Sequence, residues 1–477
     1  MDEVVKAAAG VSGTETARFK VLNDKEPRTT GEYVLWWPTE CPRVQWNDTY
    51  ELAKSIAVQA DLPIICLYAI DLAFYSMGSI RHINFLLEGL VELKKSVESS
   101  NQSRLFLRFE PVGSGAALSV VGSEDLSFSG FGEKAYAVVT DAVYMPRSSK
   151  ILASAAENLD CPLVSVESSV VIPIRKITTD GQVPDQSAFL ESWMDICTDF
   201  VKPRKSVKLT RSVPSSMEKL DCGCVFGSRD REWYPGDWLQ ESDRLKEVLN
   251  ENGVDSEVSA VTSAYRGGES GGRKLLGIFV TRKLDAYGYA SENYGETKRG
   301  EYGSLLSPYL NFGFMSPSEV ISRSMESGAK GHSLDTFLEK LALRDFAYVR
   351  SALEPNYGSY EAIKESERDA IEQIKAKDED RTYPDEEWAH AQTHDNVWNG
   401  IQRELLLRGR NILNDRNIWC YKIIDIEKSS RNAFRLARKL NDKYMLDAIG
   451  PVGIFALLGC FESYAGYRMS IVGGGEG

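Results

Sequence analysis

Residues 33–70 read YVLWWPTECPRVQWNDTYELAKSIAVQADLPIICLYAI. Two apolar runs rich in β-branched and aromatic residues, 33–37 and 62–70, enclose the segment 49–60, where apolar residues recur at helical spacing. A strand, a helix and a second strand in this order indicate a parallel sheet with a crossover helix. The stretch therefore predicts the central unit of an α/β domain.

The same alternation continues on the C-terminal side of this unit. Apolar runs at 104–109, 135–141 and 162–174 predict further strands, and 83–99 predicts another helix. We therefore expect residues 31–190 to form a Rossmann-like α/β domain with a parallel sheet. Residues 1–30 are mostly polar, so we expect them to be a flexible N-terminus.

Beyond about residue 236 the strand patterns stop. Segments 335–353, 396–409 and 430–442 show apolar residues at helical spacing, which predicts an all-α domain over 236–477. Residues 191–235 contain many Lys, Arg, Ser and Pro residues and are expected to be an interdomain linker. Within it, the basic run 202–211 fits either a phosphate-binding arm or, more simply, a solvated connection.

The composition narrows the class of protein. The chain has 477 residues and a formal net charge of −13, which disfavours attraction to DNA phosphates without excluding a local basic groove. Eight cysteines and four histidines are scattered, so no metal site is predicted, and we expect reduced thiols and a cytoplasmic location. The N-terminal residues lack the pattern of a signal peptide, and no apolar run has the length of a membrane span.

One loop is a candidate for binding a phosphate. Residues 303–319 read GSLLSPYLNFGFMSPSE, where Ser304 and Ser307 offer hydroxyl groups and Pro308 is placed to begin a helix. The N-terminus of a helix presents free N–H groups to an anion. A Ser-Pro pair also begins many helices that bind nothing, so this motif alone leaves both interpretations open.

Polar side chains recur inside the predicted helices, at positions that include Asp345, Trp398, Asn399, Gln402, Arg416, Asn441 and Asp447. Asn399 and Gln402 are three residues apart and therefore share a helix face. Arg416 and Asp447 are candidates for a buried ion pair, which is costly to assemble and usually serves a site or fixes a fold. Together these residues predict one polar cavity inside the helical domain, a common place for a cofactor.

Several motifs follow one another in a characteristic order: RHINFLLEGLVEL (81–93), VVTDAVYMPR (138–147), LLSPYLNFG (305–313), THDNVWNGIQ (393–402) and LNDKYMLD (440–447). With these motifs the chain resembles the photolyase/cryptochrome family, and within it the class II cyclobutane pyrimidine dimer photolyases. The resemblance extends from about residue 33 to about residue 467. It implies an N-terminal α/β domain and a C-terminal helical domain that binds FAD.

The resemblance also implies roles for individual residues. Ser304, Leu306 and Ser307 correspond to the loop that holds the FAD phosphates. Asn441 corresponds to the asparagine that faces flavin N5, and Arg416 and Asp447 to a salt bridge beside the isoalloxazine. Trp398 and Trp419 correspond to two electron-transfer tryptophans, and Asp345 to the glutamate that hydrogen-bonds the pyrimidine dimer. We assign Asn399 and Gln402 to the same cofactor cavity.

The chain departs from the family pattern around the flavin and the lesion, at Ile412, Asn417, Ile426, Ile449, Gly450, Val452, Gly459, Gly466 and Tyr467. Ile426 replaces the third tryptophan of the electron path, and Gly459 stands where a tryptophan stacks on the lesion. A flipped dimer must recover its unstacking cost inside the pocket. Because base–aromatic stacking contributes on the order of 1–3 kcal/mol per base, these changes predict weak lesion binding.

The segment 409–424, GRNILNDRNIWCYKII, mixes Asn411, Asn414, Asp415, Arg416 and Asn417 with apolar residues. We interpret the polar row 411–417 as a rebuilt lining of the cavity. The alternative is that residues 411, 414 and 415 face solvent and only Arg416 points inward.

These patterns lead to three functional hypotheses. The first is a repurposed class II photolyase-like protein that no longer repairs DNA and acts on a small organic ligand in the former flavin or lesion cavity. Its chemistry would rest on Asp345, Trp398, Arg416 and Asn417. The alternatives are an FAD-dependent, light-driven cyclobutane pyrimidine dimer photolyase and a cryptochrome-type flavin photoreceptor. The kept residues argue for FAD as a cofactor and the changed ones argue against it; neither DNA nor a membrane is an expected partner.

Overall fold

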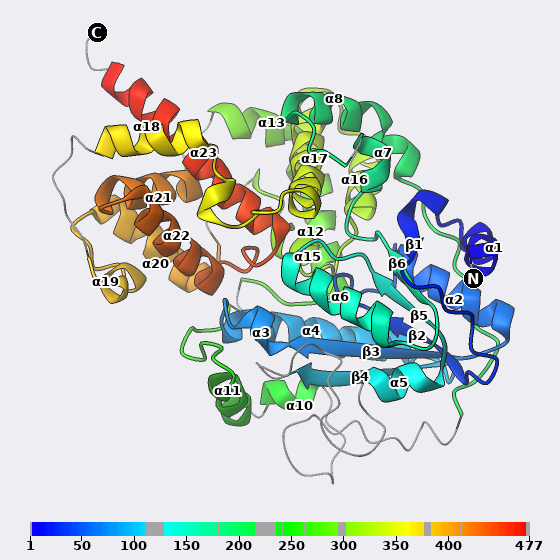
Figure 1. Ribbon diagram of the computed structural model, residues 1–477. Coiled ribbons are helices and arrows are strands. Elements are labelled where there is room, and N and C mark those ends of the chain that lie inside the picture. The colour runs from blue at the N-terminus through cyan, green and yellow to red at the C-terminus, as the bar shows by residue number, and fades with distance from the viewer. Residues whose placement is uncertain are drawn as a thin grey trace.

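The computed structural model describes residues 2–110, 128–179, 181–214, 235–240, 242–261, 264–293, 302–375, 383–410 and 413–473. Its centre is a six-stranded sheet with the strand order β1-β6-β5-β2-β3-β4 (Figure 1). The strands are β1 Phe19–Val21, β2 Tyr33–Trp37, β3 Ile64–Asp71, β4 Ser103–Glu110, β5 Ala135–Asp141 and β6 Leu163–Val166. β1 is antiparallel to β6 and all other neighbours are parallel, so the predicted α/β sheet is confirmed.

The helices associated with the sheet are α1 Asp2–Ser12, α2 Asp48–Ala60, α3 Leu72–Tyr75, α4 Ile80–Val97, α5 Phe128–Lys134, α6 Pro146–Asn158, α7 Ile174–Ile177, α8 Gln186–Ile196, and the 3₁₀ turns η1 Thr16–Arg18 and η2 Cys197–Phe200. Along β2, Val34 and Trp36 join the core that contains α1, α2 and α4. Tyr33, Leu35 and Trp37 join the opposite core with α5 and α6. The alternation of side chains along the strand divides one apolar run between two helical layers.

The remaining described elements are helical: α10 Pro235–Gln240, α11 Ser242–Glu251, α12 Glu269–Arg282, α13 Leu284–Asn293, α15 Ser307–Asn311, α16 Pro317–Glu326, α17 His332–Leu353, η3 Tyr360–Ala362, α18 Glu365–Lys375, α19 Asp385–Ala389, α20 Asn396–Arg408, α21 Leu413–Ile426, α22 Ser430–Tyr444 and α23 Pro451–Gly473. Side chains of α12, α15, α16 and α17 extend the core of the α/β domain, whereas α19 to α22 and much of α23 enclose a second core. Figure 1 shows α19 to α22 as a separate group beside the sheet. None of the described helices is both long and apolar enough to cross a membrane.

The N-terminus differs from the expectation of a flexible segment over 1–30. α1 buries Val5, Ala8 and Ala9 completely or almost completely, and β1 adds an edge strand to the sheet by pairing Phe19 with Val166. The buried stripe recurs at helical spacing, but it consists mainly of small residues. Its weak hydrophobic signal explains why the sequence pattern missed it.

The expected linker over 191–235 is also partly folded. It contains the end of α8, where Trp193 is fully buried, and η2. Residues 202–211 lie along the α/β domain, where Arg204 forms an ion pair with Asp48 and the Val207 N–H donates to Glu51. Arg211 at the end of the run also forms an ion pair, with Asp61, so the run is attached to the domain as a connection; whether it binds phosphate stays open. Residues 215–234 lie outside the described part of the chain, and the strand expected over 162–174 ends at Val166.

Arg81 connects the sheet domain to the helical domain. This side chain of α4 is 1% exposed. Its guanidinium donates to the Leu405 carbonyl at 3.2 Å and the Leu406 carbonyl at 2.8 Å, both at the end of α20, and to the Tyr444 carbonyl at 2.5 Å, at the end of α22. The last carbonyls of a helix have no partner within the helix and carry partial negative charge. One buried cation therefore satisfies two helix ends of the second core.

We expect Arg81→Met to lower the free energy of unfolding by at least about 3 kcal/mol, because several buried carbonyls lose their donor. The matched control is Arg408→Met, since Arg408 pairs only with Glu404 at an exposed position of α20, and exposed pairs contribute about 0–1 kcal/mol. Chemical denaturation of both variants measures the difference. Equal, small effects would show that Arg81 does not support the helix ends.

Candidate functional site

Arg416 and Asp447 form the ion pair that the sequence predicts. Arg416 Nη2 on α21 lies 2.7 Å from Asp447 Oδ1, in the segment that follows α22, and the two side chains are 10% and 19% exposed. The neighbouring backbone is held by the His82 ring at the Met445 carbonyl and by Asn311 Nδ2, which donates to the Ile449 carbonyl. The carboxylate is therefore presented to Arg416 by backbone that other elements fix.

Three tryptophans lie close behind this pair. Trp419 is one turn after Arg416 on α21, and its ring stacks on Trp398 of α20 with centroids 6.1 Å apart. Trp388 of α19 meets Trp398 edge to face with centroids 4.6 Å apart. All three side chains are fully buried. Sequence reasoning selected Trp398 and Trp419 and missed Trp388, which stands ten residues before Trp398 and outside any motif that the sequence analysis used.

Asn399 and Gln402 support this aromatic group. The Asn399 side chain accepts from the Thr393 N–H and hydroxyl and donates to the Thr393 carbonyl. Gln402 accepts from the Trp419 indole at 2.9 Å and donates to the Ala389 carbonyl at 3.3 Å. Both ends of each amide are thus used inside the protein. These contacts give the two residues a positioning role, and the cofactor contacts that we expected of them stay a prediction.

Asp345 lies elsewhere than the resemblance implies. Its Oδ2 accepts from the Val171 and Ile172 N–H groups and from the Trp193 indole, so it joins α17 to the α/β domain. The residue is 2% exposed. Burial raises the pKa of its carboxyl to about 6, against the neighbouring Arg344 charge and the three hydrogen bonds. Its second oxygen, Oδ1, is buried without a hydrogen-bond partner. These contacts give Asp345 a role between the domains, and its catalytic assignment stays a prediction.

The other predicted residues are dispersed over several contacts. Asn441 is buried and donates to Asp442, and Asn417 accepts from the Cys460 thiol at 3.4 Å. Leu306 is buried in the core, whereas Ser307 is exposed at the start of α15 and Ser304 is half-buried. Ile412 and Asn411 lie outside the described residues, as do the side chains of Asn414 and Asp415, so the structure describes only Arg416 and Asn417 of the polar row.

The Ser304–Ser307 turn has an unusual backbone. Leu305 has a φ of 61°, in the left-handed region that residues other than glycine seldom adopt. The Ser304 hydroxyl accepts from the Leu306 N–H at 3.4 Å and so helps to hold this turn. Backbone strain of this kind is concentrated at ligand sites. The loop therefore remains a candidate binding element.

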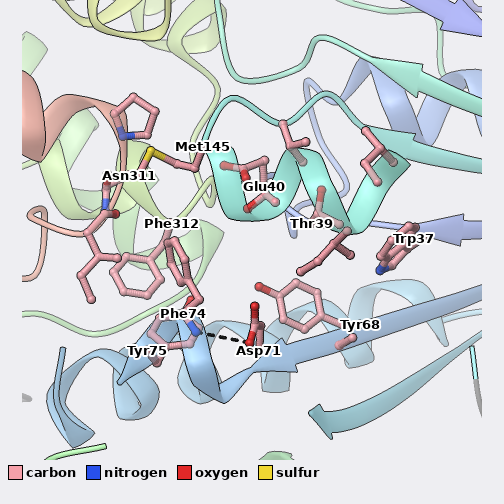
Figure 2. A pocket seen from close by; sticks show the side chains of 18 of the residues that line it. Trp37, Thr39, Glu40, Tyr68, Asp71, Phe74, Tyr75, Met145, Asn311 and Phe312 are labelled. Carbon is pink, nitrogen blue, oxygen red and sulfur yellow. Dashed lines mark hydrogen bonds between the residues drawn. The ribbon is translucent and has the colours of Figure 1, made fainter. Parts of the chain in front are cut away.

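A cavity lies between the two domains, at the carboxyl ends of β2 and β3 (Figure 2). In a doubly wound sheet, ligands bind beyond the carboxyl ends of the strands where the strand order reverses. Here β2 is that point, because β3 and β4 follow on one side and β5 and β6 on the other. The lining includes the rings of Trp37, Tyr68, Phe74, Tyr75, Phe312 and Tyr348, and the polar residues Thr39, Glu40, Asp71, Ser148 and Asn311. The helical domain adds Ile449 and Gly450, two positions that depart from the family pattern.

Glu40 is the lining carboxyl of this cavity whose pKa is raised, and Figure 2 shows its side chain among the lining rings. Burial, and then the nearby Asp141 carboxylate, raise the pKa of Glu40 to about 8. Asp141 itself accepts from the N–H groups of Thr39, Glu40 and Cys41 and so fixes the loop. Among the described residues, the buried Thr39 hydroxyl has no hydrogen-bond partner. The cavity thus offers a planar aromatic ligand apolar walls, one free hydroxyl and a carboxyl that can carry a proton.

Comparison with known proteins agrees with this architecture. Residues 34–208 match the DNA photolyase family model. The deoxyribodipyrimidine photo-lyase of Methanothermobacter thermautotrophicus is 27% identical over 94% of this chain and 90% of its own length. A class III photolyase from Agrobacterium tumefaciens superposes with a TM-score of 0.60 at 17% identity, and a Synechocystis cryptochrome with 0.62 at 14%. These two superpositions cover 91% of this chain, and 80% and 82% of the respective structures.

The chain has the photolyase/cryptochrome fold. The match over the α/β domain and the full-length relative support the photolyase/cryptochrome family, whereas the class II assignment stays a prediction. A photolyase from Sulfolobus tokodaii, described with two FAD molecules, has the same fold with a TM-score of 0.57, 17% identity and coverage of 91% and 84%. In this photolyase/cryptochrome-like chain, no group of three or more His, Cys, Asp or Glu residues that could hold a metal ion is found within the described residues.

Sequence reasoning missed Glu40 and Arg81. Both stand inside motifs that the resemblance used, PTECPR and RHINF, yet neither carries a local signal of its role. Their importance arises from contacts with distant segments, which no spacing rule encodes.

We expect the free energy of unfolding to fall as pH rises from about 5 to about 8. A carboxyl whose pKa is raised on folding stabilises the protein while it is protonated and loses this contribution as pH passes the folded-state pKa. Glu40, with a pKa of about 8, contributes over this whole range, and Glu167, with a pKa of about 7, contributes up to about pH 7. Glu40→Gln cannot ionise, so its curve should be flatter by about 2 kcal/mol between pH 6 and 8. Glu191→Gln, at an exposed position of α8, is the control, and identical slopes in all three proteins would contradict the assignment.

We expect Asp447→Ala to cost about 2–4 kcal/mol of unfolding free energy, between the values for exposed and fully buried ion pairs. The double variant Arg416→Met, Asp447→Ala should lose less than the sum of the single variants, because it leaves no unpaired charge. Denaturant titrations of the four proteins give the coupling energy. Additive losses would mean that the two charges do not interact.

Proposed function

We propose that this chain is a photolyase/cryptochrome-type flavoprotein that acts on, or responds through, a small aromatic ligand and does not repair lesion DNA. The observation that carries the proposal is the interdomain cavity, with its aromatic walls, its Thr39 hydroxyl and its Glu40 carboxyl. Ile449 and Gly450 line the cavity at positions that differ from the family pattern. These two changed residues would therefore contact a ligand bound in the cavity.

Loss of lesion recognition is supported by two further features. Asp345, the counterpart of the dimer-binding glutamate, is used for contacts between the domains. Gly459 and Gly466 occupy α23, and a Cβ at either position would meet open space. Packing around the Cβ position does not require glycine at either place, so the stacking tryptophan that the resemblance places at 459 is absent without a steric reason. The net charge of −13 further weakens attraction to DNA phosphates.

The donor set of the helical domain fits FAD. The Ser304 and Ser307 hydroxyls, in the strained turn at Leu305, would hold its phosphates. The Arg416–Asp447 pair would flank the ring system with one donor and one acceptor. When bound, FAD supplies blue-light absorption and one-electron chemistry. This chain's own residues would then orient the ring and exclude water, and the buried row that begins at Trp419 would offer it oxidisable side chains.

A second candidate function is light-driven repair of cyclobutane pyrimidine dimers. It is favoured by the full-length relative, a protein named deoxyribodipyrimidine photo-lyase. It would require lesion binding without the stacking tryptophan and with Asp345 turned away from the lesion. We therefore place it second.

Three measurements on the purified protein test the proposal. An absorption band near 450 nm, roughly where oxidised flavins absorb, should be present. Duplex DNA with a single dimer should bind no more tightly than undamaged duplex, and blue light with reduced flavin should restore no thymines. Lesion-selective binding with light-driven restoration would establish the photolyase alternative. A colourless protein that does not take up added FAD would show that the chain is not a flavoprotein.

The ligand cavity is tested with a matched pair of variants on α6. Ser148→Trp fills the cavity that Ser148 lines, whereas Ser149→Trp places the same side chain at an exposed neighbour. Mass spectrometry of small molecules released on denaturation should find an aromatic compound other than FAD with the wild type and Ser149→Trp, and none with Ser148→Trp. The same set of released molecules from all three proteins would argue against a ligand in this cavity.

A further inference from the structure

A continuous row of aromatic rings leads through the helical domain. It begins at Trp419 on α21, passes to Trp398 with centroids 6.1 Å apart, and then to Trp388 with centroids 4.6 Å apart. Tyr383 meets Trp388 edge to face at 5.8 Å, and the His394 ring stacks on Tyr383 at 5.8 Å. Each ring therefore contacts the next; four of the five residues lie between 383 and 398, and Trp419 comes from α21.

The row runs from the interior to solvent. Trp419, Trp398 and Trp388 are fully buried, Tyr383 is half-buried and His394 is exposed. Electron tunnelling weakens exponentially with distance, so charge moves most readily between rings in contact. Packing alone explains buried tryptophans, but it does not explain why the row continues to a polar pair at the surface.

The acceptors of the indole N–H groups change along the row. Trp419 donates to the Gln402 amide oxygen, Trp398 to the Trp419 carbonyl, and Trp388 to the Glu427 carboxyl at 2.9 Å. Burial raises the pKa of Glu427, with the Trp388 hydrogen bond opposing the rise. A carboxylate stabilises a neighbouring positive charge more than an amide does. An oxidised indole is thus favoured at Trp388 over Trp419, which directs positive charge outward.

The outer end of the row can separate a proton from an electron. The Tyr383 hydroxyl lies 2.5 Å from His394 Nδ1. The backbone N–H of His394 donates to the same hydroxyl at 3.2 Å. A phenol that loses an electron becomes strongly acidic. With the imidazole proton on Nε2, Nδ1 accepts the phenolic proton directly. Asn399 holds the adjacent Thr393 through three hydrogen bonds, which fixes the loop that carries His394.

We propose that Trp388, Tyr383 and His394 form the outer part of an electron-transfer path that connects Trp398 and Trp419 to the surface. The resemblance places an outer tryptophan at position 426. Because this chain has Ile426 there, the sequence predicted an electron path that stops at Trp398. The structure offers a different exit, from Trp398 to Trp388 in place of residue 426. The assignment of flavin as the physiological oxidant of this path rests on the proposed function. The contacts that form the path are independent of it.

An oxidised Trp419 takes one electron from Trp398, Trp398 takes one from Trp388, and Trp388 takes one from Tyr383. The Tyr383 O–H proton moves to His394 Nδ1, which leaves a neutral tyrosyl radical and an imidazolium ion. A thiolate in solution then supplies the electron that restores Tyr383 and becomes a thiyl radical, while the imidazolium returns the proton. The initial oxidant would be a photo-excited flavin held by the helical domain; in the experiment below, light ejects an electron from tryptophan into water.

The test needs no flavin. A near-ultraviolet flash oxidises tryptophans in the purified full-length protein, and electron paramagnetic resonance with transient absorption follows the indole and tyrosyl radicals. We expect wild type to form a tyrosyl radical as the indole radical decays. Tyr383→Phe should lose this signal, and Trp388→Phe should lose it while Tyr383 is still present. His394→Ala should also lose it, and imidazole added to the buffer should restore it.

Matched controls separate the path from general effects. Tyr421→Phe changes a tyrosine on the same helix as Trp419 that stacks on Tyr467 instead of this row, and Trp238→Phe changes a buried tryptophan that contacts Phe109. Both should leave the tyrosyl signal unchanged. A signal that survives Tyr383→Phe would overturn the proposal, and one that survives Trp388→Phe in a folded protein would remove Trp388 from the path. Flavin binding is read separately, from the visible spectrum, so the failure of one proposal does not hide the other.

Discussion

The helical domain depends on a charge that the other domain supplies. Arg81 belongs to α4 of the α/β domain, yet three of its hydrogen bonds go to carbonyls at the ends of α20 and α22. Burial lowers its pKa to about 10, so it stays charged at neutral pH. Without it, two helix ends would be buried with unsatisfied carbonyls and no compensating positive charge. Since α20 carries Trp398 and the segment after α22 carries Asp447, the geometry of the site is set from outside its own domain.

Buried charged side chains that bond to backbone carbonyls and N–H groups also position the two domains around the interdomain cavity. Arg344 on α17 donates to the Leu310 carbonyl and, on the α/β side, to the Ser169 carbonyl, while its neighbour Asp345 accepts from Val171 and Trp193. These bonds fix two domains at a distance that leaves a space beyond β2 instead of a closed contact. Buried charges of this kind cost free energy to desolvate. Their hydrogen bonds to both domains favour one domain arrangement, and with it one shape of cavity, although Arg344 Nε and Asp345 Oδ1 are buried without a hydrogen-bond partner.

Sequence patterns predicted what is local or repeated. The run YVLWW predicted a strand of the parallel sheet, and the match to LNDKYMLD predicted the ion pair of Asp447 with Arg416. They could not predict contacts whose partners are backbone carbonyls, because a carbonyl has no residue identity. Arg81 is such a case, more than 300 residues away from its targets. Asp345 is the reverse case: the resemblance named a role for the residue type, but the backbone N–H groups around it decided its actual role.

A raised pKa does not by itself mark a functional carboxyl, and the three carboxyls at the domain boundary show how to tell them apart. Asp345 accepts three hydrogen bonds, and Glu167 accepts from the Ile174 N–H and has Arg18 nearby. Both are explained by the fold that they hold together. No hydrogen bond to the Glu40 carboxyl is found within the described residues; besides burial, Asp141 raises its pKa and Arg344 lowers it. Asp345 Oδ1 is also buried without a hydrogen-bond partner, but Glu40 is the one of the three carboxyls that lines the interdomain cavity. A carboxyl with a raised pKa that faces a cavity is the one whose partner is expected to be a ligand.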